Sequence, residues 1–237
     1  MSNSFKLYHQ LLPTIVLLTL ILFLIFFYLL INYYRTKSKK KENVYELTLY
    51  EKKNIETTIL KKVLKVCNKL NIPCFLSSGT CLGYYRNNDF IDYDYDIDIG
   101  IPIDKYNKNI IPEMIKEGFI HYRTLGDIKT GLEESFRLPN TKLGPYAKID
   151  IFPHYIEEIN NKKYYCWYSY KYPKFKEKIK YRVPYFKLKK IKFKNMDVLV
   201  PDPTEKYLIN HYGDDWMIPK KQGIDYSYHS SPVSIVK

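Results

Sequence analysis

The chain has 237 residues, with 38 Lys and Arg against 25 Asp and Glu, giving a formal net charge of +13. That length supports one domain with a sizeable core plus an appendage. A basic surface can bind nucleic acid, but lysine dominates and no arginine-rich face is apparent, so we expect no nucleic-acid partner. The cysteines form no C-x-x-C pair, which argues against a structural zinc site and leaves their disulfide state open: Cys67, Cys74, Cys81 and Cys166.

The chain opens with a long uncharged segment. Residues 7–34 contain no Lys, Arg, Asp or Glu, and Leu11 to Leu30 alone supply the ~20 apolar residues that cross a bilayer. No A-x-A-like cleavage site follows, so we expect an uncleaved transmembrane anchor within residues 1–34 rather than a signal peptide. A basic stem over residues 35–44 comes next, and the positive-inside rule would keep the following domain in the cytosol.

The remaining elements predict one α+β domain with a mixed sheet over residues 45–237. Apolar residues at helical spacing predict a helix over about 46–71. Alternation predicts a strand over 92–103, and a helix is expected over 104–117. Further strands are expected over 73–78, 119–125, 131–138, 146–156 and 163–170, with a hairpin turn at 160–162. A second hairpin should turn at 195–197, and a closing helix over 203–213 should stop at Gly213.

Five aspartates crowd the stretch DFIDYDYDIDIG, residues 89–100, in a chain that is otherwise basic. Side chains two residues apart on a strand face the same side, so Asp94, Asp96 and Asp98 should form one row. Like charges this close repel unless a cation lies among them, which predicts a site for Mg²⁺ or Mn²⁺. The residues between them should face the core: Tyr95, Ile97 and Ile99.

A fourth ligand is expected from a neighbouring strand. Asp150 is the lone carboxylate in the apolar run AKIDIFP, although a strand-end polar group without a metal is an equal alternative. An EF-hand is excluded because Ile99 and Lys105 occupy its glycine and glutamate positions, counted from Asp94. An isolated D-x-D is more often a solvated strand face, but here the small residues SSGT, 77–80, lie shortly ahead of it. Such residues free backbone N–H groups to hold phosphate at a helix N-terminus.

A glycine turn, then D-x-D, then a single strand aspartate resembles the layout of the nucleotidyltransferase fold related to DNA polymerase beta. Residues 77–101, SSGTCLGYYRNNDFIDYDYDIDIGI, resemble more closely the signature of the LicD/fukutin family of phosphotransferases. That signature reads S-G-T-x-L-G-x-x-R, then F-I-P-W-D-D-D-I-D-I-G. Two later segments resemble further family blocks: KIDIFP (148–153) and VPDPTEKYLINHYGDDWMIP (200–219). The chain departs from the pattern at Asp92, Tyr93 and Tyr95, and Tyr95 resembles the fukutin-related variant.

The resemblance implies transfer of a phospho-alcohol from a CDP-activated donor to a glycan hydroxyl, with release of CMP. The alcohol would be ribitol phosphate, glycerol phosphate or phosphocholine, and the Tyr95 variant favours a polyol. The family's eukaryotic members are type II proteins of the secretory pathway, whereas the lysine-rich stem indicates a cytosolic domain.

The resemblance also assigns roles to individual residues. Asp96, Asp98 and Asp150 would be catalytic and, with Asp94, would hold the metal; Asp150 could accept the proton of the acceptor hydroxyl. Substrate would be bound by Gly79, Thr80, Arg86, His211, Tyr212 and Trp216. For Arg86 the alternative is a structural pair with Asp89 or Asp92, and for the last three it is packing of the closing helix.

Two other functions remain open at this point. Membrane-anchored glycosyltransferases also use D-x-D to bind a metal and a nucleotide sugar, but they need neither the upstream S-G-T turn nor a separate Asp150 strand. A catalytically inactive, membrane-tethered binding module is the second alternative, and metal-dependent turnover would separate it from both enzymes.

Overall fold

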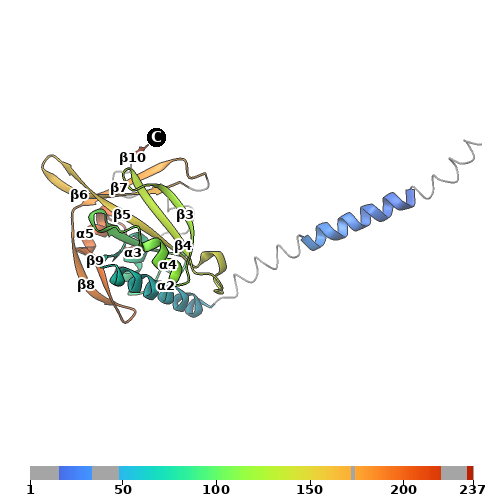
Figure 1. The fold of residues 1–237 in the computed structure, drawn as a ribbon, viewed down its shortest axis with the longest axis horizontal. Coiled ribbons are helices and arrows are strands. Elements are labelled where there is room, and N and C mark those ends of the chain that lie inside the picture. Colours follow the sequence, from blue (N-terminus) through green and yellow to red (C-terminus); the bar gives the residue numbers. More distant parts are fainter. Residues whose placement is uncertain (1–15, 34–47, 172–173, 220–233, 237) are drawn as a thin grey trace, which may run out of the picture. The chain divides into compact units, whose positions relative to one another are not determined.

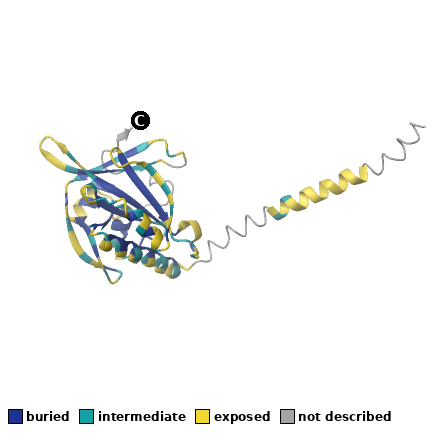
Figure 2. Cartoon of the chain, in the orientation of Figure 1, coloured by how far each residue is buried: buried dark blue, intermediate teal, exposed yellow. Residues whose placement is uncertain are grey.

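The computed structural model describes residues 16–33, 48–171, 174–219 and 234–236. The chain divides into two compact units, Met1–Leu47 and Thr48–Lys237. In the first, a helix over Val16–Tyr33 has a mean hydropathy of 2.5 and is long and apolar enough to cross a membrane. Its side chains are almost all exposed (Figure 2). The other parts of the predicted anchor and the basic stem over 35–44 lie outside the described residues.

The second unit is an α+β domain with a mixed sheet, as predicted (Figure 1). Its helices are α2 (Leu49–Lys69), α3 (Ser78–Asn87), α4 (Ile110–Lys116) and α5 (Thr204–Tyr212), with 3₁₀ turns at Ile103–Lys105 and Gly144–Tyr146. Its strands are β1 (Phe75–Leu76), β2 (Asp96–Pro102), β3 (Ile120–Asp127), β4 (Gly131–Arg137), β5 (Lys148–Ile159), β6 (Lys162–Tyr170), β7 (Lys178–Pro184), β8 (Lys187–Phe193), β9 (Met196–Asp202) and β10 (Ser234–Val236).

Strand β5 pairs with three other strands of the sheet. The main path runs β10-β7-β6-β5-β2-β1-β9-β8, and β4 pairs with both β5 and β3. The first half of β5 runs parallel to β2 and antiparallel to β4, and its second half pairs with β6. Because β2 and β5 are parallel neighbours, their side chains lie in register on the same face.

Strands β2 and β5 contribute fully buried residues to the core. Ile97, Ile99, Ile149 and Ile151 are completely buried, as the alternation of apolar residues predicted. Helix α2 begins with a capping box in which Thr48 and Glu51 satisfy each other's backbone N–H groups. Tyr95 was expected to face this core as well, but it is 36% exposed. The reason is that β2 begins only at Asp96, so the alternation does not extend back to Tyr95.

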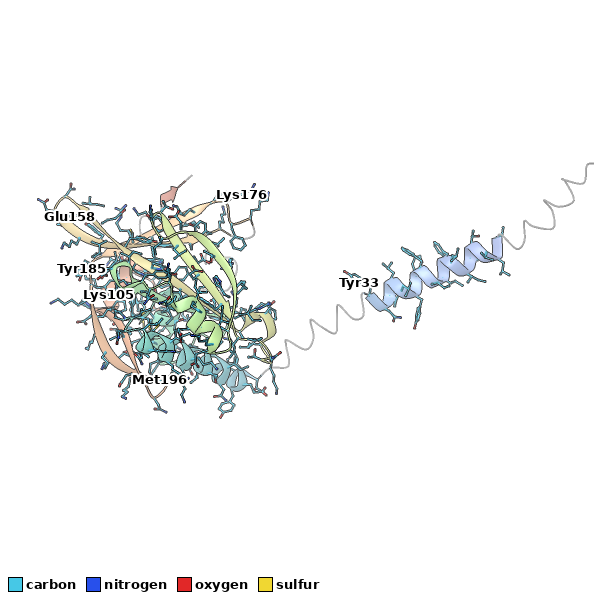
Figure 3. All side chains as sticks on the ribbon, in the orientation of Figure 1. Tyr33, Lys105, Glu158, Lys176, Tyr185 and Met196 are labelled. Carbon is cyan, nitrogen blue, oxygen red and sulfur yellow. The ribbon has the colours of Figure 1, made fainter. Side chains whose placement is uncertain are left out.

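Two predicted elements have other bounds in the structure, and strand β7 was missed. The helix expected over 104–117 is only Ile110–Lys116, because Asn107 Oδ1 accepts from the Asn109 N–H and forms a turn ahead of it. The second hairpin turns at Lys194–Asn195, just before Met196 (Figure 3), and both turn residues have positive φ, as a two-residue hairpin requires. Strand β7 was not predicted, although its apolar residues alternate and are buried: Ile179, Tyr181 and Val183.

Candidate active site

The four predicted carboxylates converge on one face of the sheet. In the parallel β2–β5 pair, Asp98 lies opposite Asp150 and Asp96 lies opposite Lys148. Neighbouring strands are only about 4.8 Å apart, so these side chains are adjacent. Asp94 precedes β2, yet its carboxylate lies close to that of Asp98. A Cβ added at Gly79 would lie 2.5 Å from Asp94 Oδ2 and 3.3 Å from Asp98 Oδ2, so both oxygens face the same point.

The electrostatics reflect this crowding. Burial and then the charge of Asp96 raise the pKa values of Asp94 and Asp98 well above the usual range. The same two causes raise the pKa of Asp150. Each ionised carboxylate therefore makes the ionisation of the next one less favourable.

The turn at the start of α3 holds Asp98 at three points. The Ser77 N–H donates to the Asp98 carbonyl oxygen at 3.1 Å, and the Gly79 N–H donates to Asp98 Oδ2 at 3.0 Å. The Asp98 N–H in turn donates to Thr80 Oγ1 at 2.8 Å. Gly79 and Thr80 were predicted to bind phosphate; in this structure both contact Asp98, and phosphate binding stays a prediction.

Two basic residues that the sequence analysis missed lie among the carboxylates. Lys148 Nζ is 3.0 Å from Asp96 Oδ2. Arg123 Nη2 is 3.6 Å from Asp150 Oδ1 and donates to Ser135 Oγ at 2.8 Å. Lys148 could have been found, because it precedes Asp150 by two residues on the same strand and so shares its face.

Arg123 could not have been found in this way. It reaches the site because the register across the sheet is Arg123 on β3, Ser135 on β4 and Asp150 on β5. Arg123 Nη2 also lies 2.5 Å from Glu133 Oε1. Burial and then Asp150 raise the pKa of Glu133 to about 7, against the attraction of Arg123.

The residues present fit a divalent cation. Among the described residues, no three His, Cys, Asp or Glu side chains are already spaced to hold a metal ion. The four aspartates nevertheless outnumber the cations around them, which are Lys148, Arg123 and, acting on Asp94, Lys52. Asp150 Oδ1 is buried without a hydrogen-bond partner. An excess of carboxylate oxygens with raised pKa values is the donor set that Mg²⁺ and Mn²⁺ prefer.

Arg86 makes neither of its two expected contacts with aspartates. Its Nε donates to Asn87 Oδ1 at 3.0 Å. Asp89 and Asp92 instead pair with Lys53, at 3.2 and 2.7 Å. The structural pair proposed for Arg86 is therefore wrong, whereas its contact with phosphate stays a prediction.

The three aromatic residues at and after the end of the chain's closing helix pack against other rings, which was the alternative to substrate binding. His211 is 4% exposed and its ring lies 5.0 Å from that of Trp167. Burial, and then His154, lower the pKa of His211 to about 3, so the ring is neutral. The Tyr212 ring packs on His211 at 4.2 Å, and Trp216 packs against Tyr85. Substrate binding by these three residues stays a prediction.

Known proteins resemble this chain over the same region. A family model described as LicD/FKTN/FKRP, nucleotidyltransferase domain, matches residues 71–203, which include all four aspartates. The human protein named "Ribitol-5-phosphate transferase FKTN" is 35% identical over 180 residues, covering 76% of this chain and 36% of the relative. The mouse protein of that name is 32% identical over 194 residues, covering 82% and 39%. The chain thus spans little more than a third of the length of these curated relatives.

Proposed function

Because the chain belongs to the LicD/FKTN/FKRP family, we propose that its second unit is a metal-dependent phosphotransferase. It would move a phospho-alcohol from a CDP-activated donor to a glycan hydroxyl and release CMP. The observation that carries the proposal is the parallel register that sets Asp98 opposite Asp150, with Asp94 and Asp96 beside them. This arrangement supports the nucleotidyltransferase fold for the domain, since that fold presents carboxylates from two neighbouring strands.

The aspartates would have separate tasks. Asp94, Asp96, Asp98 and Asp150 would hold Mg²⁺ or Mn²⁺, and the ion would supply the positive charge that a diphosphate requires. Asp150 would also accept the proton of the acceptor hydroxyl at Oδ1, the buried oxygen that lacks a hydrogen-bond partner. Arg123 lies 3.6 Å from that oxygen and would orient it.

A polyol phosphate is the alcohol we favour, with ribitol phosphate first. The named relatives are ribitol-5-phosphate transferases, and Tyr95 stands between Asp94 and Asp96 as in the fukutin-related variant of the motif. Tyr95 and Tyr146 are both exposed, with ring centroids 5.1 Å apart, so an aromatic surface adjoins the carboxylates. Such a surface can pack against a sugar or a base.

The helix over Val16–Tyr33 would anchor the protein in a membrane of the secretory pathway as a single span. The lysines of residues 35–44 favour the opposite orientation, with the domain in the cytosol. Protease protection on intact membranes decides between them, because a lumenal domain resists protease until detergent is added.

The function is tested on the full chain in detergent micelles with Mg²⁺. CDP-ribitol, CDP-glycerol, CDP-choline and UDP- and GDP-sugars are compared by thermal shift and, with a glycan acceptor that offers free hydroxyls, by the nucleotide released. We expect stabilisation by a CDP-alcohol and release of CMP, both lost in Asp150→Asn and kept in the matched surface control Asp104→Asn. Release of UDP or GDP alone would establish the glycosyltransferase alternative, and the absence of any metal-dependent turnover would favour the binding module.

A further inference from the structure

The turn that leads into α3 has a strained backbone. Ser78 has φ +40, in the left-handed region that side chains other than glycine rarely adopt. It lies between Ser77 and Gly79, both of which hydrogen-bond Asp98. Such a conformation persists only where the surrounding contacts over-determine it, so the turn needs a contact that holds it.

That contact comes from α5, far along the chain. Tyr207 Oη accepts from the Ser78 N–H at 3.0 Å and lies 3.1 Å from Ser77 Oγ. Tyr207 is 3% exposed, and its ring packs edge-on against Phe186 with centroids 5.5 Å apart. Burial raises the pKa of the Tyr207 hydroxyl, which therefore stays protonated and can both accept and donate.

The Ser77–Gly79 turn in addition holds Asp98, a candidate metal ligand. It contacts the Asp98 carbonyl oxygen, the Asp98 N–H and Asp98 Oδ2. Gly79 must stay close to the carboxylates for the last of these contacts, and it has no room for a Cβ. The direction in which Asp98 Oδ2 points therefore depends on the conformation at Ser78.

We infer that Tyr207 is a positioning residue of the carboxylate site: its hydroxyl holds the strained Ser77–Gly79 turn that aims Asp98. The inference rests on the proposed function to the extent that Asp98 binds a cation. The inference also assigns a role to a residue of the C-terminal segment 200–219, because Tyr207 lies beyond residue 203, where the match to the family model ends. A side chain beyond the residues that the family model matches thereby supports the site within them.

The test measures Mn²⁺ binding to the full chain in detergent by electron paramagnetic resonance, which needs neither donor nor turnover. Tyr207→Phe removes only the hydroxyl, and we expect the dissociation constant for Mn²⁺ to rise about tenfold, equivalent to about 1.4 kcal/mol. The matched control is Tyr181→Phe, which removes a hydroxyl on β7 that accepts from Ser169 Oγ of β6 at 3.3 Å. The control should bind Mn²⁺ within twofold of the wild type.

A rescue separates positioning from general destabilisation. Glycine adopts positive φ without strain, so Ser78→Gly in the Tyr207→Phe background should recover most of the lost Mn²⁺ affinity. If Tyr207→Phe alone fails to fold, this double variant decides the matter: Mn²⁺ affinity near that of the wild type supports the inference, and weak binding by a folded double variant overturns it.

Asp98→Asn distinguishes the two ways in which the experiment can fail. If Asp98→Asn binds Mn²⁺ as the wild type does, the metal role of the site is wrong and the proposed function fails with this inference. If Asp98→Asn abolishes binding while Tyr207→Phe matches Tyr181→Phe, only the positioning role of Tyr207 is overturned.

Discussion

Replacing Glu56 by Gln is expected to remove a pH-dependent loss of stability from the domain. Glu56 lies on α2 and is 3% exposed, and its Oε1 is 3.2 Å from Lys52 Nζ. Lys53 adds attraction and Asp89 adds repulsion, but burial outweighs them all and raises the pKa from its ordinary 4.5 to about 7. The folded chain thus keeps a proton that the unfolded chain releases.

The sign and the size follow from proton linkage. Below pH 4.5 the carboxyl is protonated in both states and contributes nothing. As the pH rises toward 7 the unfolded state binds fewer protons than the folded state, so the free energy of unfolding falls, and it levels off above about 7. At ~1.4 kcal/mol per pKa unit, the total loss is about 3 kcal/mol. For a domain of this size that is roughly 6–12 °C in melting temperature.

The assay compares melting temperatures of the full chain in detergent and EDTA between pH 4.5 and 8.5. Asp94, Asp98 and Glu133 have raised pKa values too, so only the difference between wild type and Glu56→Gln isolates this group. The variant should gain stability relative to the wild type as the pH rises. The matched control is Glu113, whose pKa is lowered by Lys116 and Lys69. Its contribution to stability changes below about pH 4.5, so the difference between wild type and Glu113→Gln should stay nearly flat over this range. A flat difference for Glu56→Gln would refute the reasoning.

Three further predictions concern the carboxylate site. Asp98→Asn should abolish turnover yet raise the melting temperature in EDTA by several degrees at neutral pH. The substitution removes an acidic group whose pKa is raised by burial and by Asp96, which costs stability once the unfolded chain ionises. An unchanged turnover rate would contradict the metal role. Gly79→Ala should lower turnover about 100-fold in a folded protein. The added Cβ would lie 2.5 Å from Asp94 Oδ2 and would displace it, and a displacement near 1 Å can lower the rate of an enzyme about 100-fold. Wild-type turnover would show that Asp94 need not stay in place. EDTA should stop activity, Mg²⁺ or Mn²⁺ should restore it, and Ca²⁺ should restore little, because its looser geometry suits phosphoryl transfer poorly; activity in excess EDTA would exclude a metal.

The parts of the site that sequence reasoning anticipated follow from local sequence patterns. A period of two sets Asp96 and Asp98 on one face and buries Ile97 and Ile99, and the structure has this arrangement. The expectation that Asp150 would come from a neighbouring strand needed only its isolation in an apolar run. Gly213 ends α5 with φ +85, as a glycine after a helix commonly does.

The parts that were missed depend on pairings between distant segments. Arg123 reaches Asp150 through the register of three strands, and Tyr207 reaches the α3 turn from the last helix of the domain. Arginine on a strand is common without any catalytic role, so Arg123 carries no local signal. Tyr207 stands in the segment 200–219 that resembles a family block, but that resemblance does not say which residue it contacts. Sequence alone does not fix which of several strands become neighbours.

The five aspartates of residues 89–98 divide into two groups with opposite electrostatics. Asp89 forms ion pairs with Lys53 and Lys194, and these contacts lower its pKa although burial works against them. Asp92 also pairs with Lys53, so both outer aspartates form ion pairs that hold the loop before β2 against α2. The pKa values of Asp94 and Asp98 are instead raised by burial and by neighbouring carboxylates. Loop attachment accounts for the outer pair of charges, whereas the inner carboxylates outnumber the cations around them, and the divalent ion that we propose would allow the fold to hold them in the ionised form.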